Sequence, residues 1–174
     1  RSPYTYVNGM LPEMGTIGCI SQSGGLGIDV LRRGETRGLR FSGLMTIGNA
    51  ADLGPTDLLE FYLAEPRTKI IGMYVEGVKE GRKFFELLRR SNGDKPVVLL
   101  KGGRTALGLQ AAASHTGSLA GDDRVWQALA RQTGALIVST LEEYLDVLLA
   151  FQMIPVRAKD PTTSAAIFGN GGGT

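Results

Sequence analysis

The residues that could carry out chemistry in this 174-residue chain are its only histidine and a set of glycine-rich segments. His115 lies in a run of small residues, 111–121. A neutral imidazole can attack a phosphoryl group, and its ordinary pKa of about 6.5 makes it available near neutral pH. A lone histidine is also often structural. With a single histidine and a single cysteine, the chain has no cluster of zinc ligands. The run around His115 therefore indicates phosphoryl chemistry or a structural role, and no metal site.

Small hydroxylated residues and glycines follow several of the expected strands. They let backbone amides approach an anion closely, and a helix that begins there adds about half a positive charge. A loop of the Ser-x-Ser-Gly-Gly type is also often a plain tight turn, and the basic residues could be ordinary solvated charges. We assign to phosphate binding the residues Ser21, Ser23, Gly24, Gly25, Lys101 and Arg104.

An acidic residue, Glu76, ends an otherwise apolar strand segment. It is either a partner for the amides of the following segment or a functional carboxylate. A carboxylate bonded to one ring nitrogen of His115 would fix the tautomer and stabilise the charged form of the ring. We therefore expect His115 and Glu76 to be the catalytic pair beside a phosphate site.

Apolar runs of strand length alternate with segments of helical periodicity along the chain. Five such units favour a doubly wound, five-stranded parallel α/β sheet with helices on both faces, a three-layer flavodoxin-like fold. In such sheets ligands bind at the carboxyl ends of the strands, where the loops named above would meet. The expected strands are 16–20, 43–47, 69–75, 97–100 and 135–138, and the expected helices are 26–33, 55–63, 79–90, 123–133 and 141–151.

Length and composition restrict the remaining possibilities. Hydrophobic residues make up 43% of the chain, and its formal charge of +2 gives no electrostatic basis for nucleic-acid binding. No apolar stretch reaches the roughly 18 residues that a membrane span needs, and Cys19 allows no intrachain disulfide, so we expect a cytoplasmic protein. The expected organisation is an entering linker (1–14), a flavodoxin-like domain (15–153), a linker (154–163) and the first strand of a second domain (164–174).

Several of these segments resemble one known family, the NDP-forming (ADP-forming) acyl-CoA synthetases, which are relatives of the succinyl-CoA synthetase α subunit. The resemblance covers nearly the whole chain, and its motifs follow the family's order and spacing. The segments that carry it are 114–121, preceded by 101–104, together with 20–24, 47–52 with 57–60, and 74–78.

The resemblance implies a succinyl-CoA synthetase-like phosphohistidine domain of a ligase. Such a ligase interconverts acyl-CoA, ADP (or GDP) and phosphate with a free acid, CoA and the nucleoside triphosphate. His115 would accept the phosphoryl group of an acyl phosphate, and Glu76 would orient it. The implied partners are a CoA-binding domain and an ATP-grasp domain or subunit that binds ATP/ADP with Mg²⁺. The resemblance is also compatible with a homo-oligomer. The isolated chain is expected to be inactive, because those domains bind most of the substrates.

Two other functions compete with the ligase. A related class, the GNAT-fused protein acetyltransferases, carries a similar domain that acts as a noncatalytic regulator and often lacks the histidine, whereas His115 is present here. A flavodoxin-like cofactor binder could use the 21–25 loop for a flavin phosphate, but the chain has no well-placed loop aromatics to hold the ring system.

Overall fold

The computed structural model describes residues 14–92, 94–103 and 123–154. Two predicted site residues, His115 and Arg104, lie outside these ranges. The predicted linkers and the strand expected within 164–174 lie wholly or almost wholly outside them as well, and they stay predictions.

The described strands form one parallel sheet in the order β2-β1-β3-β4-β5. Strands β1, β3 and β4 are almost entirely buried, as expected for a parallel sheet that is covered on both faces. The order is that of flavodoxin-like folds, which confirms the predicted fold class. The strand bounds are β1 (Ile17–Ser21), β2 (Phe41–Thr46), β3 (Ile70–Val75), β4 (Val97–Lys101) and β5 (Leu136–Val138).

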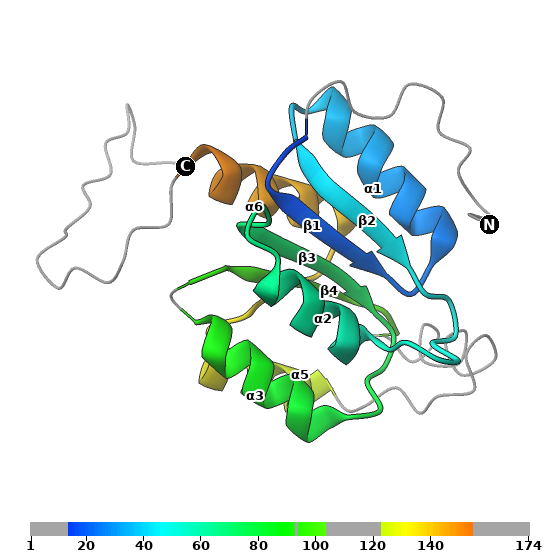
Figure 1. Ribbon diagram of the computed structural model, residues 1–174, viewed down its shortest axis with the longest axis vertical. Coiled ribbons are helices and arrows are strands. Elements are labelled where there is room, and N and C mark those ends of the chain that lie inside the picture. Colours follow the sequence, from blue (N-terminus) through cyan, green and yellow to red (C-terminus); the bar gives the residue numbers. More distant parts are fainter. Residues whose placement is uncertain (1–13, 93, 104–122, 155–174) are drawn as a thin grey trace, which may run out of the picture.

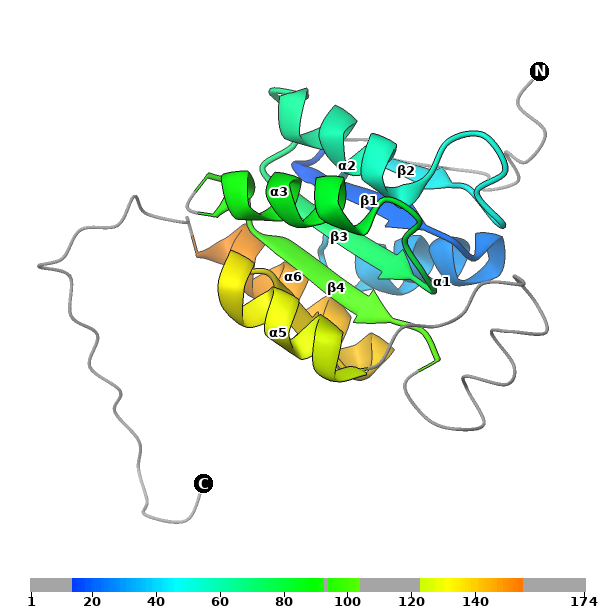
Figure 2. The same cartoon turned by 90° about the horizontal axis from the view of Figure 1, so that it is seen from below.

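Helices cover both faces of this sheet, so the domain has three layers (Figures 1 and 2). On one face lie α1 (Gly24–Thr36) and α6 (Leu141–Met153). On the other lie α2 (Pro55–Ala64), α3 (Gly81–Ser91) and α5 (Asp123–Thr133). Among the described residues, no helix is long and apolar enough to cross a membrane.

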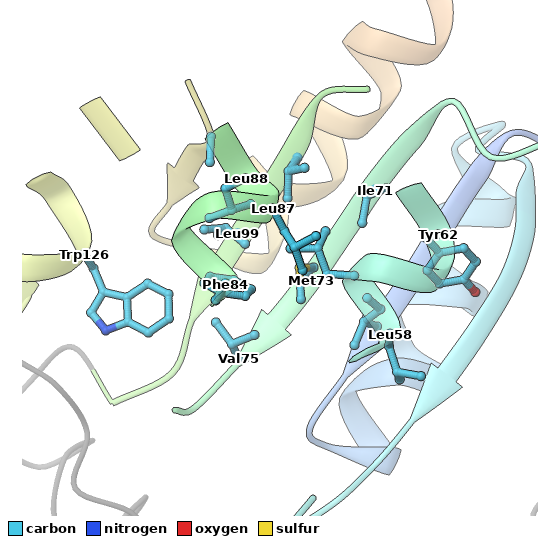
Figure 3. Packing of buried hydrophobic residues seen from close by; sticks show 14 residues of the cluster. Leu58, Tyr62, Ile71, Met73, Val75, Phe84, Leu87, Leu88, Leu99 and Trp126 are labelled. Atoms are coloured by element: carbon cyan, nitrogen blue, oxygen red, sulfur yellow. The ribbon is translucent and has the colours of Figure 1, made fainter. Parts of the chain in front are cut away.

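The alternation of side chains along the central strands produces one hydrophobic cluster on each face of the sheet. Met73 and Val75 of β3 pack toward α2 and α3, where the Phe84 ring lies edge-on to Trp126 with 6.1 Å between centroids (Figure 3). Cys19 belongs to the opposite cluster and is buried, as its apolar sequence setting indicates. Leu100 of β4 packs in that second cluster too.

Helix α1 begins earlier than the sequence suggests. Gly24 and Gly25 were expected in the loop, but they form the first helical residues, after Ser23 in an extended conformation. The Ser23 hydroxyl accepts a hydrogen bond from the Leu26 amide at 3.3 Å and so caps the helix. Glycine is tolerated there because first-turn amides have no intrahelical acceptor to lose.

The strand order reverses between β1 and β3, since the chain moves from β1 outward to β2 and then returns past β1 to β3. A point of this kind leaves a crevice between the loops that follow the two strands, and ligands of open α/β sheets bind there. Four of the predicted site residues lie where these two strands end: Ser21 is the last residue of β1, Ser23 and Glu76 follow β1 and β3, and Gly24 begins α1.

Candidate functional site

The ends of β1 and β3 are held in register beside each other. Ser21 is the pairing partner of Tyr74, and the Gln22 amide donates to the Tyr74 carbonyl at 3.1 Å. The residues that follow these two strands therefore lie side by side at the same edge of the sheet. This brings the predicted phosphate-binding loop and the predicted catalytic acid Glu76 to one edge of the sheet.

The two serines of the first loop shape its backbone. The buried Ser21 hydroxyl donates to the Ser23 carbonyl at 2.6 Å and accepts from the Ser23 amide at 3.1 Å. Ser23 uses its hydroxyl oxygen to cap α1, which leaves its O–H hydrogen for another acceptor. Within the loop, Ser21 thus holds the turn, and Ser23 sets the start of the helix.

The first turn of α1 is open above its two glycines. A Cβ placed on Gly24 or Gly25 would have no heavy atom of the described residues within 4 Å, and neither residue has a positive φ. Packing and backbone conformation therefore do not require glycine at these positions. Amides at a helix start can be approached closely by an anion, and the phosphate role of these glycines stays a prediction.

Glu76 is buried, with 8% of its surface exposed, one residue beyond the end of β3. Its Oε1 accepts a hydrogen bond from the Tyr74 hydroxyl at 3.2 Å. The interpretation of Glu76 as a partner for the following amides is not what the structure shows: the Glu76 and Gly77 amides both donate to the side-chain Oε1 of Gln22, at 2.5 and 3.1 Å. The other carboxylate oxygen, Oε2, is buried and has no hydrogen-bond partner among the described residues.

The start of the loop after β4 closes tightly on this acid. The Gly102 amide donates to the Val75 carbonyl at 2.8 Å. A Cβ on Gly102 would lie 2.7 Å from the Tyr74 hydroxyl oxygen and 3.2 Å from Cγ of Glu76. Only glycine fits at this distance, so the loops after β3 and β4 meet at the Tyr74–Glu76 pair.

The environment of Tyr74 keeps its hydroxyl protonated. Burial first, and then the charge and hydrogen bond of Glu76, raise the pKa of Tyr74 to about 12. A tyrosine with this pKa remains a hydrogen-bond donor across the neutral range. The Tyr74 hydroxyl is thus a fixed donor to one oxygen of the carboxylate.

Lys101 does not behave as the solvated charge that was considered for it. It is only 5% exposed, its ammonium donates to the Gly102 carbonyl, and its Nζ lies 5.6 Å from the centroid of the Trp126 ring. Strand alternation explains the difference: Lys101 pairs with Val75 and points to the α3–α5 face, whereas Tyr74 and Glu76 belong to the opposite alternation. The structure therefore does not bring the Lys101 side chain to the Glu76 carboxylate, and its predicted phosphate role stays untested, as do those of Arg104 and His115.

Two residues of the site were missed by sequence reasoning, Gln22 and Tyr74. The signal for Tyr74 was its spacing of two from Glu76, which puts both side chains on one face of an extended segment. Gln22 gave no such signal, because its role depends on residues 54 and 55 positions away in the chain. Among the described residues, no group of three or more potential ligands could hold a metal ion.

A neighbouring loop, after β2, is fastened to the same edge. The Lys79 ammonium donates to the carbonyl of Ala50 at 3.1 Å, which ties the loop after β3 to the loop after β2. Ala50 is buried and has a positive φ of 50°, a backbone conformation that alanine rarely adopts. The loops after β1, β2, β3 and β4 are therefore joined to one another by specific contacts.

The chain is similar in sequence to subunits and single chains of ADP-forming CoA ligases. The α subunit of Pyrococcus furiosus acetate–CoA ligase [ADP-forming] I is 40% identical over 159 residues, which cover 91% of this chain and 34% of that subunit. The 4-hydroxybutyrate–CoA ligase [ADP-forming] of Nitrosopumilus maritimus is 35% identical over 147 residues, covering 83% of this chain and 21% of the ligase. The chain thus spans between about a fifth and about a third of the length of these relatives.

A solved structure shares the fold. The dinucleotide-forming acetyl-coenzyme A synthetase 1 of Ca. Korarchaeum cryptofilum, in complex with phosphate and ADP, matches with a TM-score of 0.77 and 37% identity, over 82% of this chain and 31% of that one. The model of the succinyl-CoA ligase like flavodoxin domain matches residues 14–151. This chain therefore belongs to the family of succinyl-CoA ligase-like flavodoxin domains.

Proposed function

We propose that this chain is the phosphoryl-relay domain of an ADP-forming acyl-CoA synthetase, with His115 as the phosphoryl acceptor and Glu76 as its orienting acid. The observation that carries the proposal is the buried Glu76 carboxylate, whose Oε2 has no partner among the described residues, at the strand-order reversal beside the open start of α1. A buried carboxylate oxygen is an acceptor for a donor that the ligand or another segment must bring.

The relatives support a ligase and also indicate which part of the reaction belongs to this domain. They are named for two acids, acetate and 4-hydroxybutyrate, although this chain matches both at 35% identity or more. A domain common to ligases with different acids suits the step that they share, the handling of phosphate. We therefore assign acyl and CoA recognition to a CoA-binding domain, and nucleotide and Mg²⁺ binding to an ATP-grasp domain or subunit, elsewhere in the protein.

The proposed reaction has three transfers. Phosphate attacks the thioester carbonyl of acyl-CoA and expels the CoA thiolate, which forms an acyl phosphate. A ring nitrogen of His115 then attacks the phosphorus; the N–P bond forms, the P–O bond to the acyl group breaks, and the free acid leaves as a carboxylate. Finally a β-phosphate oxygen of ADP attacks the same phosphorus, which gives ATP and restores the neutral imidazole.

The described residues have two functions in these steps. The first-turn amides of α1, at Gly24 and Gly25, would hold phosphate oxygens together with the Ser23 hydroxyl, with Ser21 keeping the loop in shape. Oε2 of Glu76 would accept the N–H of the His115 ring nitrogen that does not carry phosphate, stabilising the ring as it gains positive charge.

The test uses the full-length protein with its nucleotide-binding partner. Incubation with [γ-³²P]ATP and Mg²⁺ runs the last transfer backwards and is expected to label the chain with phosphate that is stable in base and labile in acid. His115→Ala should abolish the label, and Ser114→Ala should retain it as the matched control. A wild-type protein without acid-labile label, or a label that persists in His115→Ala, contradicts the proposal and favours the noncatalytic regulatory alternative.

A further inference from the structure

Two residues hold Glu76, one through its backbone and one through its carboxylate. One is Gln22, the residue after β1, and the other is Tyr74 within β3. We propose that Gln22 and Tyr74 are positioning residues, which direct Oε2 of Glu76 toward the phosphoryl-accepting imidazole. This inference rests on the proposed function. Neither residue has to touch the phosphoryl group for this purpose.

Gln22 fixes the backbone that carries the acid. Its Oε1 accepts the amides of Glu76 and Gly77, and a carbonyl oxygen has two lone pairs, so both are in use. The backbone amide of Gln22 is bonded to β3 as well. These three hydrogen bonds join residues on either side of the strand-order reversal, and they set where the Cα of Glu76 lies.

Tyr74 fixes the rotation of the carboxylate. Its hydroxyl donates to Oε1 of Glu76, so this oxygen is turned back toward β3. The two oxygens of a carboxylate diverge from the trigonal carboxyl carbon, so holding Oε1 at the Tyr74 hydroxyl also fixes the direction of Oε2. Gly102 leaves no room for the pair to shift toward β4, because even a Cβ there would collide with the Tyr74 hydroxyl.

An unpaired buried oxygen is not by itself a sign of function. The described residues contain two others, Oε1 of Glu35 and the hydroxyl of Tyr62. Tyr62 belongs to α2, and its ring lies over Gly18 of β1 within the hydrophobic cluster on that face of the sheet (Figure 3). Glu76 differs because side chains from two strands hold its backbone and its other oxygen, and because it lies at the sheet edge where ligands bind.

Tyr62 provides a matched control for Tyr74. Phenylalanine at either position removes one tyrosine hydroxyl and keeps the ring. Only the Tyr74 hydroxyl donates to Glu76, whereas the Tyr62 hydroxyl has no hydrogen-bond partner among the described residues. In the full-length protein with its nucleotide-binding partner, we expect Tyr74→Phe to lower kcat for acyl-CoA formation by about tenfold, the effect of one lost hydrogen bond to a charged group. The KM values for CoA and ATP should stay within about twofold, since neither substrate contacts Tyr74 in this account.

Gln22→Met removes the acceptor of two amides at nearly constant volume, and it should lower kcat by more than Tyr74→Phe does, again with little change in KM. Tyr62→Phe should keep both parameters within about twofold of wild type. Thermal unfolding of each variant separates lost activity from lost structure, and Tyr74→Phe remains decisive if Gln22→Met fails to fold.

Two results distinguish this inference from the proposed function. If wild type acquires no acid-labile label that depends on His115, the proposed function fails, and the positioning roles fail with it. If wild type is labelled at His115 while Tyr74→Phe is folded and matches Tyr62→Phe in kcat, the positioning proposal alone is overturned. A fall in kcat in Tyr74→Phe, with KM unchanged and Tyr62→Phe unaffected, supports it.

Discussion

Two buried charged residues lie at opposite ends of the sheet and are treated differently by the fold. Lys95 precedes β4, is 7% exposed, and donates its ammonium to the carbonyls of Tyr62, Leu63 and Glu65 at 2.9, 2.8 and 2.8 Å. All three of its N–H groups have acceptors at the end of α2. Glu76 follows β3, is similarly buried, and keeps one carboxylate oxygen without a partner among the described residues.

The difference separates a structural charge from a functional one. Burying an ionised group is costly unless it is paired or hydrogen-bonded, and Lys95 meets that condition within the domain itself. It also supplies donors to α2 carbonyls that would otherwise have no intrahelical partner. Glu76 meets the condition only in part, and so the missing donor has to come from outside the described residues.

The largest expected effect on stability is at Lys95. Lys95→Met keeps most of the side-chain volume but removes the ammonium donor from three carbonyls at the end of α2, of which that of Glu65 keeps the Thr68 amide as a donor. We expect a loss of about 3 kcal/mol in the free energy of unfolding. Lys69→Met, at an exposed lysine, should cost less than about 0.5 kcal/mol. Urea unfolding followed by circular dichroism measures both. Equal midpoints for the two variants would contradict the claim that the hydrogen bonds of Lys95 stabilise the fold.

The next effect concerns buried groups that the fold keeps neutral. Burial raises the pKa of Cys19 to about 12, and that of Tyr144, its hydrogen-bonded neighbour, is raised as well. Both groups ionise more readily in the unfolded chain than in the folded protein. Below their ordinary pKa values the free energy of unfolding is therefore unaffected, and it falls as the pH rises from those values toward the raised pKa values of the folded protein. Between pH 9.5 and 11 we expect a loss of about 1.4 kcal/mol per pH unit for Cys19 alone.

Cys19→Ala tests this expectation, because it removes the titrating thiol. Its free energy of unfolding should fall less steeply with pH over the same interval, by about 1.4 kcal/mol per unit. Parallel curves for wild type and Cys19→Ala would show that the buried thiol does not contribute to the alkaline loss of stability.

The smallest effect distinguishes two glycines of α1. A Cβ on Gly27 would lie 2.9 Å from Cγ2 of Thr46, whereas a Cβ on Gly25 would meet nothing within 4 Å. Gly27→Ala should therefore lower the free energy of unfolding by about 1 kcal/mol, and Gly25→Ala should raise it by up to about 1 kcal/mol. Gly25→Ala should also raise the KM for phosphate in the full-length protein, because the methyl group covers the amide. An unchanged KM for phosphate would remove Gly25 from the site.

Much of the fold could be predicted from the chain because each element is locally encoded. The apolar runs at 16–20, 69–75 and 97–100 lie within one residue of β1, β3 and β4 at either end. The start of α1 was misplaced because Gly24 and Gly25 suggest a loop, whereas the Ser23 cap begins the helix there. Capping outweighed the low helix propensity of glycine.

The site was only partly predictable for a different reason. Glu76 was identified because an acid at the end of an apolar strand is unusual in any fold. Gln22 has a role that exists only once β1 and β3 are paired, and Lys101 turns away because strand alternation gives it the opposite face. The Tyr74–Glu76 contact is local, but the spacing of two that produces it also occurs in any extended segment. Side-chain direction at a sheet edge depends on register, which single-residue arguments do not supply.

The most direct measurement of the central claim is a comparison of Glu76→Gln with Glu80→Gln, an exposed acid in the same loop. Phosphorylation of the full-length protein by ATP, followed by rapid quench, should be slowed by about a hundredfold or more in Glu76→Gln and by less than about twofold in Glu80→Gln. The unfolding midpoint of Glu76→Gln should stay at or above that of wild type, since a buried charge with an unpaired oxygen is removed. A Glu76→Gln protein that is phosphorylated at the wild-type rate, or that loses stability as Lys95→Met does, would contradict the account.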